Sequence, residues 1–174
     1  MAFTVQTDEG VAGANAYVSV QFFRDFFLDL GVDYTAESDS TIEVWIREGT
    51  SYQDLRWSYG GSKLNGRDQY LQFPRVGLYD AECYLVEGVP IEIKYSTCYY
   101  AKAYNDLSTL FITDNSNKGA IIEEYKRLDK LEKRFKYENG SKAGTNKFPV
   151  IQEGDLITQN SGFALTTGFR GKRA

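Results

Sequence analysis

Hydrophobic residues recur at helical spacing in three stretches of the chain. The first stretch follows Ser19, a good helix N-cap residue, and stops at Gly31, whose conformational freedom suits a helix end. Its apolar positions are Phe22, Phe23, Phe26, Phe27 and Leu30. This spacing predicts an amphipathic helix with its charged residues on the other side.

A second amphipathic helix is predicted over roughly residues 41–57. Its apolar positions follow the i, i+3, i+4, i+7 pattern, and Ser40 and Glu43 have the spacing of a capping box. Gly49 lies inside this stretch, where glycine costs about 1 kcal/mol relative to alanine. A close crossing with another helix would explain a glycine at this position.

The third stretch opens at Pro90, because proline suits the first turn of a helix, and runs to about Phe111. Its apolar residues form two lines. One line holds Ile91, Tyr95 and Cys98, and the other holds Ile93, Tyr100, Tyr104, Leu107 and Phe111. A helix that is apolar on two sides is central in its fold or lies between subunits.

The remaining segments are less regular. Residues 1–18 are small and polar and predict an extended N-terminal arm, and residues 58–80 form a long glycine-rich loop. Residues 120–137 are ambiguous, since their apolar spacing favours a helix while part of the stretch alternates as a strand does. The chain after residue 140 is again rich in Gly, Asn and Ser and predicts an arm or tail.

Composition adds two constraints. Aromatic residues make up 15% of the chain, which indicates a large core or an extra interface, and composition does not separate the two. The formal net charge is −4, whereas a protein that grips DNA phosphates normally has a basic excess. Tight DNA binding by the whole domain is therefore not expected.

No motif for catalysis or metal binding is found. Histidine is absent, and Cys83 and Cys98 lack metal-ligand spacing, so we expect free thiols in a reducing cytosol. Gly60 to Lys63 fails the phosphate-loop pattern, because its glycines follow a predicted helix and its lysine follows a serine. The carboxylates are scattered among polar neighbours. We therefore expect no catalytic residue, no metal, no cofactor and no enzymatic activity, and neither a signal peptide nor a membrane-spanning segment.

Three short motifs occur in an order that resembles a known protein family. They are Gly-Ala-Asn-Ala-Tyr-Val-Ser at 13–19, Gly-Arg-Asp-Gln-Tyr-Leu-Gln-Phe-Pro-Arg-Val-Gly at 66–77 and Val-Pro-Ile-Glu-Ile-Lys-Tyr-Ser at 89–96. In this order the chain resembles the head–tail adaptor family of tailed bacteriophages, also called head completion or neck proteins. Some members carry the label DnaT-like single-stranded DNA-binding. The chain departs from the family pattern at Ala16, at Phe73 in place of tryptophan, at Val89 and at Ser96.

The resemblance implies a mainly α fold. We expect a small helical bundle of three or more helices with a minor β-hairpin and extended N- and C-terminal arms. The expected organisation is an arm over 1–18, a helical adaptor domain over 19–140 with the hairpin near 121–137, and an arm or tail over 141–174. At 121–137 the resemblance to two short strands overrides the helical spacing.

The resemblance also implies a structural role in the virion. Such a subunit forms a ring, in twelve copies, under the portal protein, links the head to the downstream tail or nozzle protein, and lets double-stranded genomic DNA pass without sequence-specific binding. It is assembled in the host cytoplasm and contacts no membrane. The alternative is a single-stranded DNA-binding accessory protein for replication or packaging, in which tyrosines stack on bases and a positive groove follows the backbone.

Two groups of residues are candidate contacts. Residues 73–75 predict a rigid hook, because proline fixes its own backbone and keeps the preceding residue extended; alternatively, Phe73 fills the domain's own core. The basic tail is either a solvated terminus or an arm that becomes ordered on a partner or near DNA. The candidate interface residues are Phe73, Pro74, Arg75, Phe169, Arg170, Lys172 and Arg173.

Overall fold

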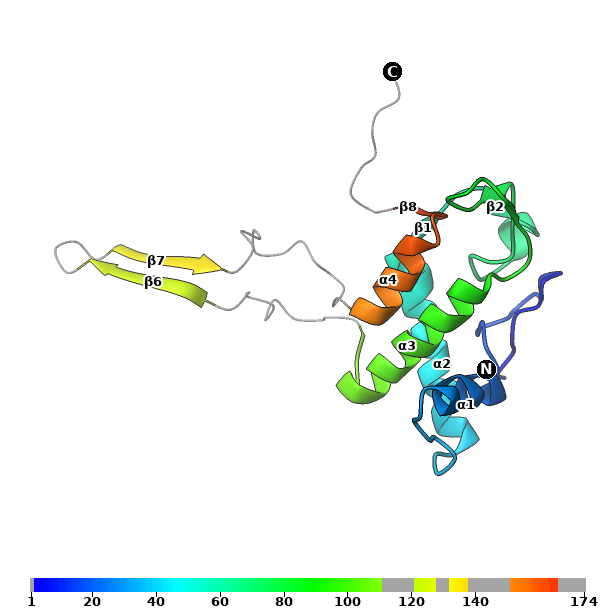
Figure 1. The fold of residues 1–174 in the computed structure, drawn as a ribbon, viewed down its shortest axis with the longest axis horizontal. Helices are drawn as coiled ribbons and strands as arrows, with labels where there is room; N and C mark the ends of the chain where they lie inside the picture. The colour runs from blue at the N-terminus through cyan, green and yellow to red at the C-terminus, as the bar shows by residue number, and fades with distance from the viewer. Residues whose placement is uncertain (1, 111–120, 128–131, 138–150, 166–174) are drawn as a thin grey trace, which may run out of the picture. The chain divides into compact units, whose positions relative to one another are not determined.

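The computed structural model describes residues 2–110, 121–127, 132–137 and 151–165. The chain divides into two units, each of which is described by itself. Met1–Leu110 and Val150–Ala174 form the first, here called the compact unit, and Phe111–Pro149 form the second, here called the basic segment for the charge described below. Figure 1 shows helices α1 to α4 in the compact unit and a two-stranded ribbon, β6–β7, in the basic segment.

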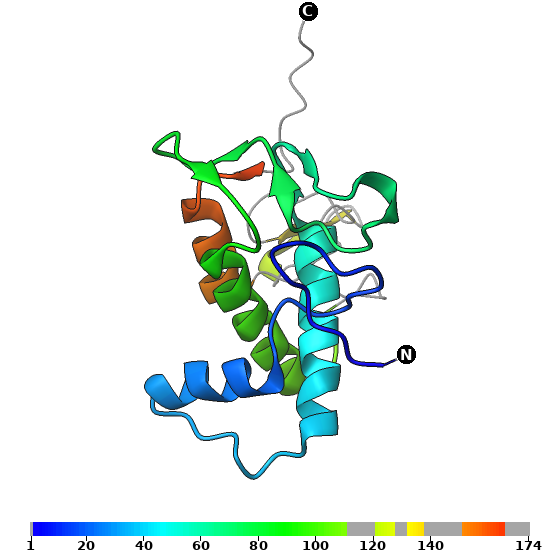
Figure 2. The ribbon, with the colours of Figure 1, turned by 90° about the vertical axis from the view of Figure 1, so that its right-hand side faces the viewer.

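Helix α1 (Val20–Asp29) forms as its apolar spacing predicts. The Ser19 hydroxyl accepts a hydrogen bond from the Phe22 backbone N–H at 3.1 Å, and the helix is followed by Gly31 at φ +80°. Phe23 and Phe27 are buried and lie edge to face, with ring centroids 4.9 Å apart. In Figure 2 this short helix runs across the longer helices rather than along them.

Helices α2 (Asp39–Arg56) and α3 (Ile91–Leu107) pack closely against each other. A Cβ atom added at Gly49 would lie 2.7 Å from the Ala101 backbone nitrogen, so the close crossing expected at this glycine is confirmed. Helix α2 begins two residues earlier than its capping-box pattern indicates. Its N-cap is Ser38, which accepts a hydrogen bond from the Thr41 N–H.

Helix α4 (Gln152–Asn160) was not predicted, because its residues were assigned to a C-terminal arm. Gly154 lets α4 approach α3 closely, since a Cβ there would lie 2.6 Å from the Tyr100 ring. The Tyr100 hydroxyl donates to Asp155 Oδ1 at 2.8 Å and accepts from Trp57 Nε1 at 3.0 Å. Figure 2 shows α4 beside α3, so the chain after residue 150 belongs to the compact unit.

Short strands give the compact unit its β structure. They are β1 (Ser58–Tyr59), β2 (Ser62–Lys63), β3 (Arg75–Val76), β4 (Leu78–Tyr79), β5 (Leu85–Val86) and β8 (Ala164–Leu165), with a 3-10 turn at Gly66–Asp68. β1 pairs with β8, β2 with β3 and β4 with β5, all antiparallel. The expected helical bundle with a minor hairpin is therefore wrong. The described residues form a mixed α/β fold of four helices and several small antiparallel strand pairs.

The N-terminal residues are folded onto the compact unit rather than extended as an arm. Val5 bridges Ala16, and Ala14, Ala16 and Tyr17 are buried. The Gln6 side chain donates to the Phe73 carbonyl at 3.0 Å, which ties this segment to the glycine-rich loop. Small residues here allow the chain to lie close to the core.

The basic segment contains strands β6 (Ile121–Arg127) and β7 (Glu132–Tyr137), which pair antiparallel. The pair of strands that the family resemblance implied near 121–137 is present, and the helix that the apolar spacing favoured is not. The register is irregular between Ile121 and Glu123. A bulge of this kind increases the local twist of a ribbon.

Candidate nucleic-acid interface

Charge is divided unevenly along the chain. The compact unit up to Leu165 contains eight Lys and Arg residues against 18 Asp and Glu, a net charge of −10. The basic segment contains nine against six, a net charge of +3, and residues 166–174 contain three basic residues and no acidic one. Phosphate groups are therefore repelled by the compact unit and attracted by the other two regions.

Several cations of the compact unit are neutralised by carboxylates of the same unit. Arg24 pairs with Asp39 at 2.7 Å, and Lys102 pairs with Asp106 at 2.9 Å. Arg56 lies 3.1 Å from the buried Asp155. An incoming phosphate would have to displace these carboxylates.

Two further cations hold the glycine-rich loop together. Arg75 donates to the carbonyl oxygens of Gly60 at 2.6 Å and Gly61 at 2.9 Å, and burial lowers the pKa of its guanidinium. Lys63 Nζ donates to the carbonyls of Gln69 and Tyr70, both at 3.0 Å. Strands of two residues form few backbone hydrogen bonds, and the hydrogen bonds from Arg75 and Lys63 to the loop carbonyls add to them.

The candidate hook at 73–75 lies inside the fold. Phe73 has 0% of its surface exposed and packs edge to face against Tyr59, with ring centroids 4.7 Å apart. Pro74 is also buried, and Arg75 is engaged as described above. Phe73 thus fills the domain's own core, which was the second alternative. The interface role of these residues stays a prediction, and Phe169, Arg170, Lys172 and Arg173 lie outside the described residues.

A partly buried carboxylate, which no sequence motif indicated, supports the same loop. Asp54 accepts hydrogen bonds from the Tyr17 hydroxyl at 2.6 Å and from the Gln72 N–H at 2.9 Å. The Tyr17 oxygen in turn accepts from the Phe73 N–H at 3.2 Å. Burial raises the pKa of Asp54 to about 6, although both hydrogen bonds favour the charged form. Asp54 is therefore the residue that links the N-terminal segment, α2 and the loop.

The β6–β7 ribbon carries more than half of the Lys and Arg residues of the basic segment. Its two strands contain five Lys and Arg residues, three Glu residues and three aromatic residues. The register places Lys126 opposite Lys133 and Tyr125 opposite Arg134. A stretch that is rich in both cations and aromatic residues has the composition that suits a ligand with phosphates and flat rings.

Other kinds of site receive no support from the described residues. No group of three or more His, Cys, Asp or Glu there could hold a metal ion. An open groove of about 480 Å³ lies between α1, α3 and α4. Phe27, Tyr99 and Ala103 line it, together with the Lys102–Asp106 ion pair. Within the same residues, no helix is both long and apolar enough to cross a membrane.

Comparison with known proteins gives one match. The model of the DnaT-like ssDNA binding protein family matches residues 1–162, which include the compact unit through α4 and the β6–β7 ribbon. No curated protein and no solved structure matches the chain significantly. Because the match extends over nearly the whole sequence, the chain belongs to the DnaT-like single-stranded DNA-binding protein family.

Proposed function

We propose that the chain binds single-stranded DNA through its basic segment, with the β6–β7 ribbon as the contact surface. The observation that carries this proposal is the separation of charge. The compact unit is strongly acidic, while the ribbon combines cations with aromatic residues. Cations attract the phosphate backbone and aromatic rings stack on unpaired bases without selecting a sequence. The family name supports the same function.

This proposal explains how an acidic protein could bind DNA. The net charge of −4 argues against binding by the whole domain, but it is the sum of a surface that repels DNA and segments that attract it. Binding would be confined to the basic segment. It involves no catalytic step.

The test is a titration of the full chain into a fluorescent oligo-dT, followed by anisotropy at several salt concentrations. The test variant is Lys126→Gln, Lys133→Gln, Arg134→Gln. Removal of three phosphate contacts should lower affinity at least about tenfold and reduce the slope of log affinity against log salt by about 2. The matched control is Lys63→Gln, Arg67→Gln, Lys102→Gln in the compact unit, which should bind as the unchanged chain does.

Two results would overturn the proposal. The first is no anisotropy change at micromolar protein and low salt. The second is equal loss of affinity in the ribbon variant and the compact-unit control. Tighter binding of a duplex than of a single strand of the same length would replace single-stranded DNA by double-stranded DNA as the ligand.

A second candidate function is the structural head–tail adaptor of a tailed phage. One support is the acidic compact unit, because a negatively charged channel lining does not hold DNA as it passes. The other is the set of large apolar side chains at the surface, which suits contacts with protein partners. In this role the chain forms a ring under the portal and contacts a downstream tail protein in the virion. Negative-stain imaging of the chain mixed with purified portal tests it. A second ring layer supports the adaptor, and bare portal rings exclude it.

A further inference from the structure

The groove between α1, α3 and α4 leaves apolar side chains uncovered at its edge. Phe27 lines it and is 1% exposed, so this part of the lining belongs to the core. Leu30, at the end of α1, and Leu107, at the end of α3, also line it and are 53% and 55% exposed. The two leucines can therefore contact a partner that lies in the groove.

The open form of the groove and its helical walls favour a helical peptide as the occupant. Small-molecule sites usually bury most of the ligand's surface, which an open groove does not do. Backbone N–H and C=O groups of the walls are largely paired within their own helices, so an extended peptide would find few backbone partners there. A helix brings its own paired backbone and binds through one apolar face.

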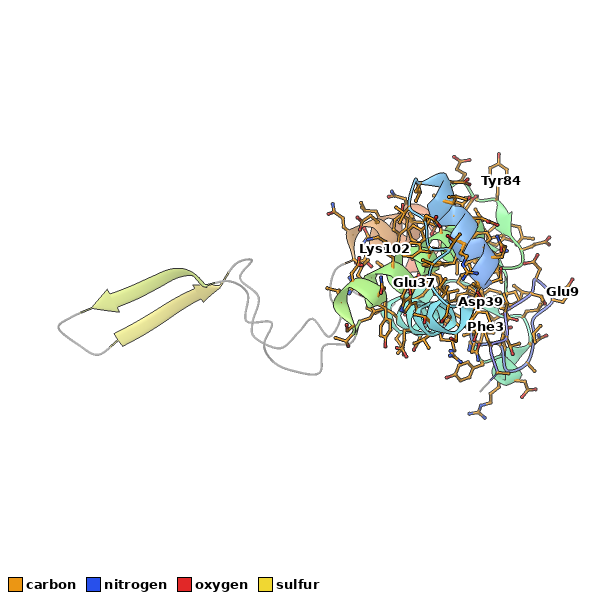
Figure 3. The ribbon with its side chains drawn as sticks, turned by 90° about the horizontal axis from the view of Figure 1, so that it is seen from below. Phe3, Glu9, Glu37, Asp39, Tyr84 and Lys102 are labelled. Carbon is orange, nitrogen blue, oxygen red and sulfur yellow. The ribbon has the colours of Figure 1, made fainter. Side chains whose placement is uncertain are left out.

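The charges that line the groove are mostly negative. Lys102 forms an ion pair with Asp106 at 2.9 Å, and Figure 3 shows Lys102 among the side chains at the surface of the compact unit. Glu153, in the first turn of α4, also lines the groove and is exposed. One cation and two carboxylates give a local charge of −1, in a unit whose net charge is −10.

Two helices end at this groove, which adds to the negative potential. Leu30 directly follows α1, Leu107 is the last residue of α3, and neither helix has a basic residue in its last turn. The negative ends of both helix dipoles therefore act together with the carboxylates and favour a cation. A complementary partner combines apolar side chains with Lys or Arg.

We propose that this groove binds a basic amphipathic helix of another protein. Apolar residues of the partner, spaced at i, i+3 or i+4 and i+7, would pack against Leu30, Tyr99 and Leu107. Its Lys or Arg residues would lie beside Asp106 and Glu153. Helices of a second copy lack this chemistry, because α1 to α4 have net charges of −1, −2, 0 and −2.

This inference does not depend on DNA binding, because the groove lies in the compact unit. The probe is a synthetic Leu/Lys peptide of about 14 residues, with Leu at the spacing given above and Lys elsewhere. It is titrated into the ¹⁵N-labelled full chain while the amide signals are followed by NMR. We expect shifts at the groove residues of α1, α3 and α4, and an affinity that falls as salt rises from about 50 mM to about 500 mM.

Substitution of the exposed leucines tests the apolar part of the contact. Leu30→Ser with Leu107→Ser should weaken peptide binding at least about tenfold, because both side chains lie on the contact surface. Leu55→Ser is the matched control, since Leu55 is 62% exposed on α2 and does not line the groove. The amide spectrum of each variant also shows that the compact unit is folded.

Charge reversal separates recognition by the groove from general attraction to an acidic protein. Asp106→Lys with Glu153→Lys should lose the Leu/Lys peptide and bind a Leu/Glu peptide of the same spacing. The control is Glu82→Lys with Glu87→Lys, which makes the same change of charge at exposed positions that do not line the groove. The control should keep its preference for the Leu/Lys peptide.

Three outcomes would overturn the inference. They are no shift at the groove residues, equal affinity of the Leu30→Ser, Leu107→Ser variant and the unchanged chain, and loss of preference in both charge variants alike. Groove shifts that depend on protein concentration without peptide would assign the groove to a second copy. Oligo-dT binding by the Leu30→Ser, Leu107→Ser variant should be unchanged, so this proposal and the DNA-binding one can fail separately.

Discussion

The compact unit and the basic segment differ in how they use charged residues. In the compact unit, cations such as Arg24 and Arg75 are bound by carboxylates and carbonyls of the same fold. In the basic segment, the register sets Lys126 opposite Lys133. The first arrangement stabilises the fold of the compact unit, whereas the second gathers cations in a segment whose net charge is +3. The whole-chain charge of −4 hides this difference, because the charge of each region, and not the sum, determines whether that region attracts phosphates.

The largest expected effect is a loss of stability in the compact unit, which is independent of ligand binding. Phe73→Ala should lower the free energy of unfolding by about 3–5 kcal/mol, because it removes a buried ring from the aromatic core. Urea denaturation of the full chain measures this loss, with Phe73→Leu as the milder control. A loss under about 1 kcal/mol would mean that Phe73 is not a core residue and would restore its predicted role as a hook.

The next effect concerns the ribbon. Tyr125→Ala should weaken oligo-dT binding by about 1–3 kcal/mol, the range for loss of one aromatic platform, and leave the urea midpoint of the compact unit unchanged. Tyr125→Phe is the control and should bind as the unchanged chain does, because stacking needs the ring and not the hydroxyl. Equal weakening by both substitutions would contradict stacking.

A smaller effect is a pH dependence that belongs to the compact unit. The pKa of Asp54 in the folded chain is about 6, above its ordinary value of 3.8, so the folded state binds the proton more tightly. Stability should therefore rise as pH falls through 6 and level off below the unfolded pKa, with a slope of at most about 1.4 kcal/mol per pH unit. Urea titrations between these pH values should show the slope, and Asp54→Asn should remove it. A slope that persists in Asp54→Asn would assign it to another group.

The smallest effect tests the idea that cations of the compact unit are engaged locally. Lys102→Gln removes an i, i+4 ion pair on the surface of α3 and should change the free energy of unfolding by under about 0.5 kcal/mol. Oligo-dT affinity should not change. A several-fold loss of affinity would place DNA on the compact unit and remove the contrast between the two regions.

The apolar spacing was enough to predict three helices, because their cores repeat every three or four residues. Phe23 and Phe27 on α1, Ile42 and Ile46 on α2 and Ile93 on α3 are buried as that pattern requires. The start of α2 was displaced because Ser38 and Ser40 are both good caps, and the first turn accepts Asp39 next to its positive dipole end.

The elements that were missed depend on contacts distant in sequence. Helix α4 has few apolar residues and an internal glycine, and it becomes stable only where Gly154 lies under Tyr100. The paired strands of the glycine-rich loop are two residues long, too short for alternation to appear. The Tyr17–Asp54 pair joins residues 37 positions apart, and no local spacing marks it.

The candidate site was predictable only in part. The ribbon near 121–137 followed from the family resemblance, while its own apolar spacing favoured a helix. The local charge was present in the sequence, but averaging over the chain concealed it. Dividing the charge count requires knowing where the units begin and end, and those boundaries are set by α4 returning to α3.

That return of α4 makes the basic segment an insertion between two helices of one unit. Loop-closure entropy grows only with the logarithm of length, so doubling the inserted stretch costs about 0.6 kcal/mol. The insertion can therefore be lengthened, shortened or exchanged by recombination with little penalty to the rest of the protein. Related proteins are expected to vary most between the end of α3 and the start of α4. The same compact unit could then bind a different ligand when only the basic segment is replaced.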